Sequence, residues 1–294
     1  MTIAYRELYY PGRGGIRLYA RDYPGDAEHV TVLCLPGLTR NSADFEDLAA
    51  HLAPRFRVLA PDLRGRGRSA RDADWHNYQP AVYLADVLAL LDAESVARTV
   101  VIGTSLGGIL GLMLAFTVRP RIAGLVLNDV GPEIDPRGAA RIREYAGRSA
   151  SVASWQEATT QLRSIYGIAW PDLKPDRWEA LARRTYREQP SGIPELDYDP
   201  KIGEALRQSP ADAPDLWPLW SALGSIPTLA IRGALSDILS AQTLARMKRE
   251  KPDLTTVEVA NRGHVPLLDE PEVLRSIDRF LEQLSSRGSE RAII

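Results

Sequence analysis

The sequence is poor in the residues that build disulfide frameworks and metal sites. Its 294 residues include a single cysteine, Cys34, so no intramolecular disulfide can form, and a buried strand thiol is expected there. Only four histidines are present, with no His-Glu-x-x-His pair, no His-x-His and no P-loop. The sequence therefore predicts a protein without a metal and without a cofactor.

Excess charge and long apolar runs are also missing. Acidic and basic residues number 38 and 36, so no net field would attract nucleic acid or an anionic membrane. The densest basic cluster, at residues 64–68, alternates with glycine and is interpreted as a solvated loop. No segment reaches the roughly 18 apolar residues of a membrane span, and no secretion signal is recognisable. We expect a cytoplasmic protein that acts on a small molecule, and the oligomeric state stays open.

Short apolar segments alternate with longer amphipathic ones along most of the chain. Continuous apolar strands separated by helices are typical of a parallel sheet covered on both faces, which makes this an α/β protein. Residues 8–10 and 16–23 flank a glycine-rich turn and predict an antiparallel hairpin at the sheet edge. The other predicted strands span residues 30–35, 58–60, 100–102, 125–127, 228–231 and 256–259, and the predicted helices span 44–52, 81–91, 106–116, 241–250 and 272–284.

The alternation of strands and helices is interrupted once. It stops after residue 130 and resumes at residue 226, and the interval is rich in Pro, Arg and Trp. Helical periodicity persists there, so we expect a helical cap at residues 131–225 inserted into a core formed by residues 1–130 and 226–285. Residues 286–294 show no pattern and are expected to form a disordered tail.

The strongest local motif is Gly-Thr-Ser-Leu-Gly at residues 103–107, a G-x-S-x-G sequence between a predicted strand and a predicted helix. In that place Ser105 occupies a strained turn, and small residues two positions before and after it let neighbouring segments approach. A chance match or a broken dinucleotide-binding G-x-G-x-x-G is the alternative, but serine stands where the second glycine would be. We interpret Ser105 as a nucleophile.

Two backbone N–H groups are candidates for an oxyanion hole. The Leu106 N–H lies at the start of the helix behind Ser105, where N–H groups are free and the helix dipole is positive. The Leu38 N–H lies in the sharp Pro-Gly-Leu-Thr turn at residues 36–39, after a predicted strand. Each donor of this kind contributes about 3–4 kcal/mol to transition-state stabilisation.

A serine nucleophile needs a base, and a carboxylate usually orients that base. His264 follows the last predicted strand, at the sheet edge that carries Ser105, and is the candidate base. Asp237, after the penultimate strand, is the preferred acid because it gives the chain order Ser, Asp, His. Asp129, which follows the strand after the nucleophile strand, is the alternative. The remaining histidines are interpreted as surface or packing residues: His29, His51 and His76.

Together these motifs resemble the α/β-hydrolase superfamily over nearly the whole chain. Besides the elbow, Asp237 and His264, the resemblance is carried by Leu-Pro-Gly-Leu at residues 35–38 and by a D-x-R-G-x-G-x-S loop at residues 62–69. It implies the α/β-hydrolase fold, a mostly parallel eight-stranded sheet with helices on both faces and a helical cap after the sixth strand. One departure is Pro36, where many relatives have histidine before the oxyanion-loop glycine.

The resemblance also implies a reaction, in which Ser105 attacks a carbonyl and water hydrolyses the acyl-enzyme. A small carboxylic ester is the expected substrate. Similar enzymes cleave lactones, carbon–carbon bonds or amides, and some similar proteins are non-hydrolytic small-molecule receptors, so these alternatives stay open. An apolar or aromatic acyl pocket is suggested by aromatic residues of the cap: Trp155, Tyr166, Trp170, Trp178, Tyr186, Trp217 and Trp220.

Overall fold

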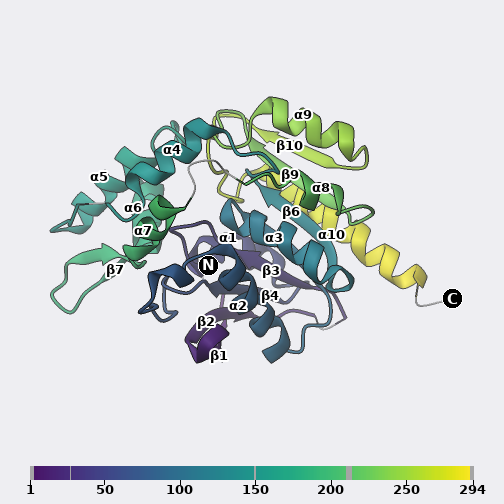
Figure 1. The fold of residues 1–294 in the computed structure, drawn as a ribbon, viewed down its shortest axis with the longest axis horizontal. Coiled ribbons are helices and arrows are strands. Elements are labelled where there is room, and N and C mark those ends of the chain that lie inside the picture. Colours follow the sequence, from purple (N-terminus) through teal and green to yellow (C-terminus); the bar gives the residue numbers. More distant parts are fainter. Residues whose placement is uncertain (1–2, 27, 149, 210–213, 292–294) are drawn as a thin grey trace.

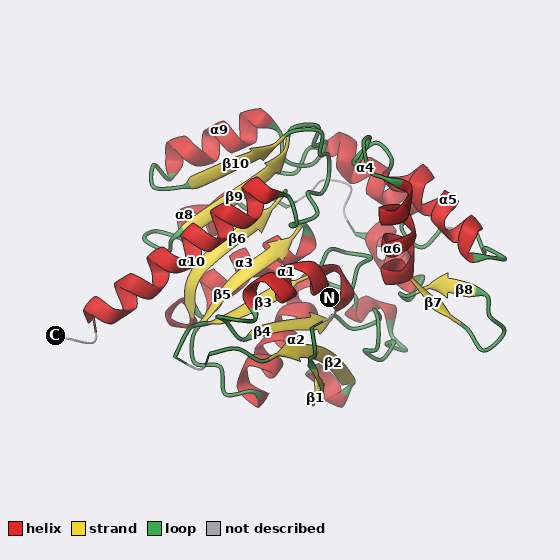
Figure 2. Cartoon of the chain, turned by 180° about the vertical axis from the view of Figure 1, so that it is seen from behind, coloured by secondary structure: helices red, strands yellow, loops and turns green. Residues whose placement is uncertain are grey.

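The computed structural model describes residues 3–26, 28–148, 150–209 and 214–291. Its centre is an eight-stranded sheet in the order β1-β2-β4-β3-β5-β6-β9-β10, seen edge to edge in Figure 2. The strands are β1 (Arg6–Pro11), β2 (Arg17–Tyr23), β3 (Thr31–Leu35), β4 (Val58–Asp62), β5 (Thr99–Thr104), β6 (Ile122–Asn128), β9 (Thr228–Gly233) and β10 (Thr255–Val259).

The sheet is mostly parallel, as the alternation of strands and helices predicts. Strand β2 runs antiparallel to both of its neighbours, β1 and β4, whereas the pairs from β4 through β3, β5, β6 and β9 to β10 are parallel. The predicted edge hairpin is β1–β2, and its turn requires glycine because Gly14 and Gly15 have φ angles of 79° and 77°. The α/β-hydrolase fold expected from the motifs is therefore confirmed.

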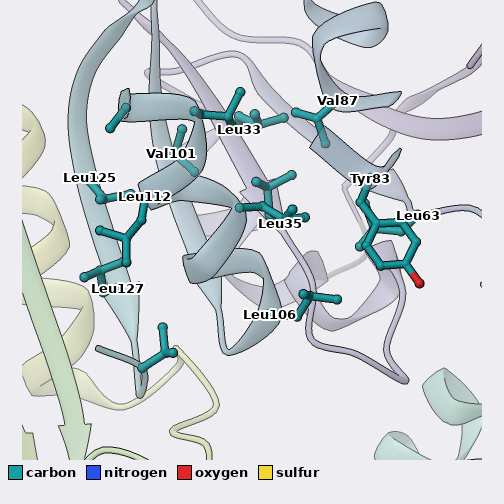
Figure 3. Close-up of a cluster of buried hydrophobic side chains, with 14 of the residues drawn as sticks. Leu33, Leu35, Leu63, Tyr83, Val87, Val101, Leu106, Leu112, Leu125 and Leu127 are labelled. Carbon is teal, nitrogen blue, oxygen red and sulfur yellow. The ribbon is translucent and has the colours of Figure 1, made fainter. Parts of the chain in front are cut away.

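Helices cover both faces of the sheet, and the alternation of side chains along each strand divides the core into two layers. On one face, α2 (Pro80–Ala93), α3 (Leu106–Thr117) and α9 (Ala241–Glu250) cover buried leucines of the central strands. Figure 3 shows side chains of this layer, among them Leu33, Leu35 and Val101 of the strands and Leu106 and Leu112 of α3. On the other face, α1 (Glu46–Leu52) and α10 (Pro271–Arg291) cover the alternate strand residues.

The interval 131–225 contains more than the helices that its periodicity predicts. Helices α4 (Pro136–Tyr145), α5 (Trp155–Tyr166) and α6 (Pro175–Thr185) lie beside one end of the sheet, together with α7 (Lys201–Gln208) (Figure 1). A small antiparallel hairpin of β7 (Tyr186–Glu188) and β8 (Pro194–Leu196) joins them. Helix α8 (Trp217–Ser221) instead packs against α3 of the core, with Trp220 buried in the core layer.

The carboxyl-terminal tail differs from its expectation. Helix α10 continues to Arg291, so the structure places most of residues 286–294 in a helix, while residues 292–294 lie outside the described residues. The segment contains no proline, and one interior glycine costs only about 1 kcal/mol in a helix that the preceding turns have already nucleated. Absence of an apolar pattern did not by itself end the helix.

Short 3₁₀ turns complete the described elements: η1 (Arg13–Gly15), η2 (Ser42–Phe45), η3 (Trp75–Asn77) and η4 (Arg119–Arg121). Among the described helices, none combines the length and apolar character that a membrane crossing requires.

Candidate active site

Ser105 sits on a sharp turn between β5 and α3, as its motif predicts. Its backbone has φ 52° and ψ −115°, a conformation that costs a residue other than glycine about 1–3 kcal/mol. The surrounding backbone holds it in place, because the Ser105 N–H donates to the Asn128 carbonyl at 3.0 Å and the Ser105 carbonyl accepts from Gly108 at 2.8 Å. The serine is thereby lifted to the carboxyl end of the parallel sheet.

The two glycines of the motif are required by close packing of backbone. A Cβ added to Gly103 would lie 2.3 Å from the Gly107 carbonyl oxygen, and one added to Gly107 would lie 2.0 Å from the Leu35 carbonyl oxygen. Neither neighbour is a flexible side chain that could move aside. These contacts bring β3, β5 and α3 close together, which is what the turn at Ser105 needs.

His264 lies in the loop between β10 and α10, and its imidazole reaches Ser105. Its Nε2 is 2.9 Å from the Ser105 Oγ, and the ring is buried. The interval 131–225 anchors the loop, since Gly263 donates its N–H to the Ala169 carbonyl at 2.7 Å and the Trp170 indole donates to the Val265 carbonyl at 2.7 Å. The position of His264 after β10 brings it to the sheet edge that carries Ser105. The hydrogen bonds to the turn after α5 then fix the conformation of its loop.

The carboxylate that faces His264 belongs to Asp129, at the carboxyl end of β6. Its Oδ2 lies 2.7 Å from His264 Nδ1 and accepts the Ser236 hydroxyl at 2.6 Å, while its Oδ1 accepts the Gly233 N–H at 2.8 Å. Asp129 is fully buried, and these donors satisfy its oxygens. Because the carboxylate accepts a hydrogen bond from the Nδ1–H of the ring, Nε2 carries no proton and is able to accept the proton of Ser105.

Asp237, the preferred acid from the sequence, does not meet His264. Its two oxygens accept from Nε and Nη2 of Arg141 on α4, at 2.6 and 2.9 Å. Burial alone would raise the pKa of Asp237, but the hydrogen bonds and charge of Arg141 hold it below its usual range. The preference for Asp237 is thus corrected: chain order cannot separate the two aspartates, since both lie between Ser105 and His264.

The direction of the two predicted oxyanion donors follows from the geometry of their peptide groups. In a trans peptide the N–H points opposite to the preceding carbonyl. The Gly37 carbonyl accepts the Arg40 N–H at 3.2 Å, and the Ser105 carbonyl accepts N–H groups of the first turn of α3. The N–H groups of Leu38 and Leu106 therefore point away from those bonds, and both residues border the same cavity as Ser105.

Two cavities meet at Ser105. The larger, of about 550 Å³, is mostly apolar, with walls from α3, α4 and α7 and from the side chains of Tyr78 and Tyr83. The smaller, of about 80 Å³, adjoins His264 and contains polar groups of Thr39, Arg40 and Tyr166. A substrate bound across Ser105 would thus have an apolar part on one side and a short part on the other.

Only part of the aromatic pocket expected from the sequence is present at these cavities. Tyr166 and Trp170 border the smaller one. Trp178, Tyr186 and Trp220 are buried in packing clusters instead. The sequence interpretation missed Ser236, which braces Asp129, and the tyrosines of the larger cavity. A serine in the loop after a predicted strand was the available signal for Ser236, but its role depends on which aspartate bonds to the histidine.

Across the described residues, no group of three or more histidine, cysteine, aspartate or glutamate side chains is arranged to hold a metal ion. The polar groups at Ser105 are those of the residues already described. The hydroxyl, imidazole and carboxylate side chains, together with the backbone N–H donors, form an arrangement that is able to carry out acyl transfer.

A mostly parallel sheet that carries a serine on a strand-to-helix turn, with a histidine and an aspartate at neighbouring strand ends, defines a hydrolase of the α/β type. Residues 32–277 match the model of the alpha/beta hydrolase family, and the chain belongs to that family. Hydrolase activity is supported by this membership and by the relatives described next.

Comparison with individual proteins gives the same class. The chain is 32% identical over 265 residues to the 3-hydroxybutyrate-oligomer hydrolase of Cupriavidus necator, covering 87% of this chain and 90% of the relative. It is 25% identical over 252 residues to the 2-(acetamidomethylene)succinate hydrolase of Mesorhizobium japonicum, covering 85% and 87%. A crystal structure of an alpha/beta hydrolase from Novosphingobium aromaticivorans superposes with a TM-score of 0.91 and 45% identity, over 96% of this chain and 99% of that one.

Proposed function

We propose that the protein hydrolyses a small carboxylic ester through an acyl-enzyme on Ser105, with His264 as general base and Asp129 as the acid that orients it. One observation carries this proposal. The Ser105 hydroxyl, the His264 ring and the Asp129 carboxylate form an unbroken line of hydrogen bonds, 2.9 Å and 2.7 Å long, at the end of the sheet. A hydroxyl held in this way is an activated nucleophile.

The reaction proceeds in two halves. Ser105 Oγ attacks the ester carbonyl carbon while its proton passes to His264 Nε2, and the Leu38 and Leu106 N–H groups stabilise the oxyanion. Collapse of the tetrahedral intermediate breaks the ester C–O bond, and the proton on His264 passes to the departing alcohol. Water then attacks the acyl-enzyme, with His264 again taking the proton. Collapse of the second tetrahedral intermediate breaks the bond between the acyl carbon and Ser105 Oγ, the proton on His264 returns to Oγ, and the carboxylic acid is released.

The two cavities support a substrate with unequal ends. The larger cavity suits an apolar chain, and the smaller one suits a short group that carries a polar atom. The similarity to a 3-hydroxybutyrate-oligomer hydrolase supports esters of short hydroxy acids as the substrate class, because the units of such an oligomer are joined by ester bonds. We also propose that the part of residues 131–225 from α4 through α7 forms the cap that encloses the acyl chain, whereas α8 belongs to the core.

A fluorophosphonate probe tests the nucleophile directly. Mass spectrometry of the labelled protein is expected to find one adduct on Ser105, and the Ser105→Ala variant is expected to lose both the adduct and the turnover of p-nitrophenyl butyrate. The 3-hydroxybutyrate dimer and p-nitrophenyl acetate, assayed alongside, compare hydroxy-acid and simple esters. A folded wild-type protein without an adduct and with only background turnover would reject the proposal and favour a ligand-binding role.

A further inference from the structure

The loop at residues 62–69 is only partly solvated, which corrects the expectation from the sequence. Arg64 and Arg66 are each 1% exposed, whereas Arg68 is exposed. Arg64 is paired with two carboxylates, those of Asp86 and Asp72. Within the described part of the chain, Arg66 makes no ion pair. Burial of a guanidinium without a counter-charge costs stability, and hydrogen bonds from its N–H groups are what offset that cost.

The Arg66 side chain bonds to main-chain carbonyls. Its Nε donates to the Leu38 carbonyl at 2.9 Å and its Nη1 donates to the Arg64 carbonyl at 2.6 Å. Hydrogen bonds from a charged donor are roughly twice as strong as neutral ones. The guanidinium also lies 4.6 Å from the centre of the Tyr83 ring, over its face. Arg66 thus connects its own loop to the turn that carries the predicted oxyanion donor.

The backbone on either side of Arg66 is fixed by the segment that follows β8. The Gly67 N–H donates to the Asp197 carbonyl at 2.9 Å, and the Asp199 N–H donates to the Gly65 carbonyl at 2.7 Å. Arg66 and Tyr198 form an antiparallel bridge between these bonds. The guanidinium therefore projects from a backbone that cannot shift easily, which makes it a rigid support.

The turn at Leu38 needs such a support. It contains Gly37, the residue type with the most backbone freedom, and the backbone bond that closes it, from the Arg40 N–H to the Gly37 carbonyl, is long at 3.2 Å. That bond orients the peptide bearing the Leu38 N–H, and the Arg66 bond fixes the next peptide through the Leu38 carbonyl. With both carbonyls held, the N–H between them has one direction.

We infer that Arg66 is a positioning residue for the oxyanion hole, holding the Leu38 carbonyl so that the Leu38 N–H stays directed at the oxyanion. The inference rests on the proposed function, in which Ser105 forms that oxyanion. An oxyanion donor acts more strongly on the transition state than on the bound substrate. Loss of the Arg66 bond should therefore lower kcat more than it raises KM.

Arg66→Gln is the test variant, and Arg64→Gln is its matched control. Both replace a buried arginine of the same loop, but Arg64 has no bond to the oxyanion turn among its described contacts. We expect Arg66→Gln to lower kcat for p-nitrophenyl butyrate by about 10–100-fold with KM within about threefold, less than the loss of a whole donor. A trifluoromethyl ketone, which forms a hemiketal oxyanion on the serine, should bind more weakly by a similar factor.

The remaining variants separate positioning from folding. Arg64→Gln should lower the melting temperature at least as much as Arg66→Gln while leaving the ketone affinity per folded molecule unchanged. Arg66→Lys should regain part of kcat, since its ammonium can donate to the Leu38 carbonyl, and it serves if Arg66→Gln does not fold. Unchanged ketone affinity in both Arg66 variants would overturn the inference. A wild-type protein that gives no fluorophosphonate adduct would instead refute the proposed function, and the inference with it.

Discussion

At the scale of single residues, the hydrogen-bond partners of each carboxylate determine which aspartate bonds to His264. Asp129 accepts from Gly233, Ser236 and His264, so its buried charge is balanced where it lies. Asp237 is occupied by the bidentate contact with Arg141 and would have to give up that pairing to reach the histidine. The histidine therefore has one carboxylate partner in the described structure.

Isosteric variants separate the two aspartates. We expect Asp129→Asn to lower kcat by about 10³–10⁴-fold, because an amide in that place favours the wrong tautomer of His264. Asp237→Asn should keep kcat within about threefold, since its carboxylate pairs with Arg141 and not with the ring of His264. Loss of this partly exposed ion pair should lower the stability by only roughly 0–1 kcal/mol. Steady-state turnover of p-nitrophenyl butyrate measures both. A larger loss for Asp237→Asn than for Asp129→Asn would reverse the assignment.

At the scale of elements, the strands and core helices could be predicted because most strands are continuous apolar runs and each core helix buries a periodic apolar face. The sequence failed where elements are short or take their stability from one another. Strands β7 and β8 have three residues each, too few for a period, and exist because they pair. Helix α8 lies within the interval assigned to the cap, but Trp220 packs into the core layer, a choice that only three-dimensional contact reveals.

The same limit applies to the site. The G-x-S-x-G motif and a histidine after the last strand are local signals, so Ser105 and His264 could be proposed from sequence. The sequence proposed two candidate acids but could not choose between them, because the choice depends on the positive φ of Asp129 and on a donor at the end of β9, which is far away in the sequence. Arg66 was misread for the same reason: its partner, the Leu38 carbonyl, has no side-chain signature.

The segment after β8 makes the stability of the protein depend on pH. Asp197 lies there with its side chain 18% exposed, facing Arg187, Asp62, Arg71 and the amide of Asn41. Burial raises its pKa from 3.8 to about 6, with the charge of Arg187 opposing the shift and that of Asp62 adding to it. Since the folded state binds this proton more tightly than the unfolded state, the contribution of Asp197 to stability falls as pH rises from about 4 to about 6.

Asp197→Asn removes this titration. We expect the melting temperature of the variant relative to wild type to be higher at pH 7 than at pH 4.5, because the wild type alone must bury the charge at the higher pH. Thermal unfolding of both proteins in matched buffers at the two pH values measures the difference. A relative melting temperature that is the same at both pH values, or lower at pH 7, would contradict the assignment.

At the scale of the whole molecule, we expect the range of substrates to depend on the cavity between the sheet end and helices α4 and α7. Ile109 on α3 borders the larger cavity, and its replacement by tryptophan would fill part of it. We expect Ile109→Trp to lower kcat/KM for p-nitrophenyl decanoate by about tenfold or more relative to the acetate, as overpacking excludes the longer chain.

Ile168→Trp is the matched control, since Ile168 is 69% exposed and borders neither cavity. Its chain-length profile, measured over p-nitrophenyl esters from acetate to decanoate, should follow that of the wild type. An Ile109→Trp profile that also follows the wild type would show that the acyl chain does not occupy the larger cavity.

The contacts that anchor the histidine loop have a consequence for exchanging parts between hydrolases. Gly263 and Val265, on either side of His264, are tied to the Ala169 carbonyl and the Trp170 indole, which lie in the inserted segment. We expect a chimera that keeps this core but imports a foreign insertion to retain Ser105, Asp129 and His264 and still lose the two hydrogen bonds that hold the loop of His264. A transplant should therefore carry both the carbonyl acceptor at residue 169 and the indole at residue 170.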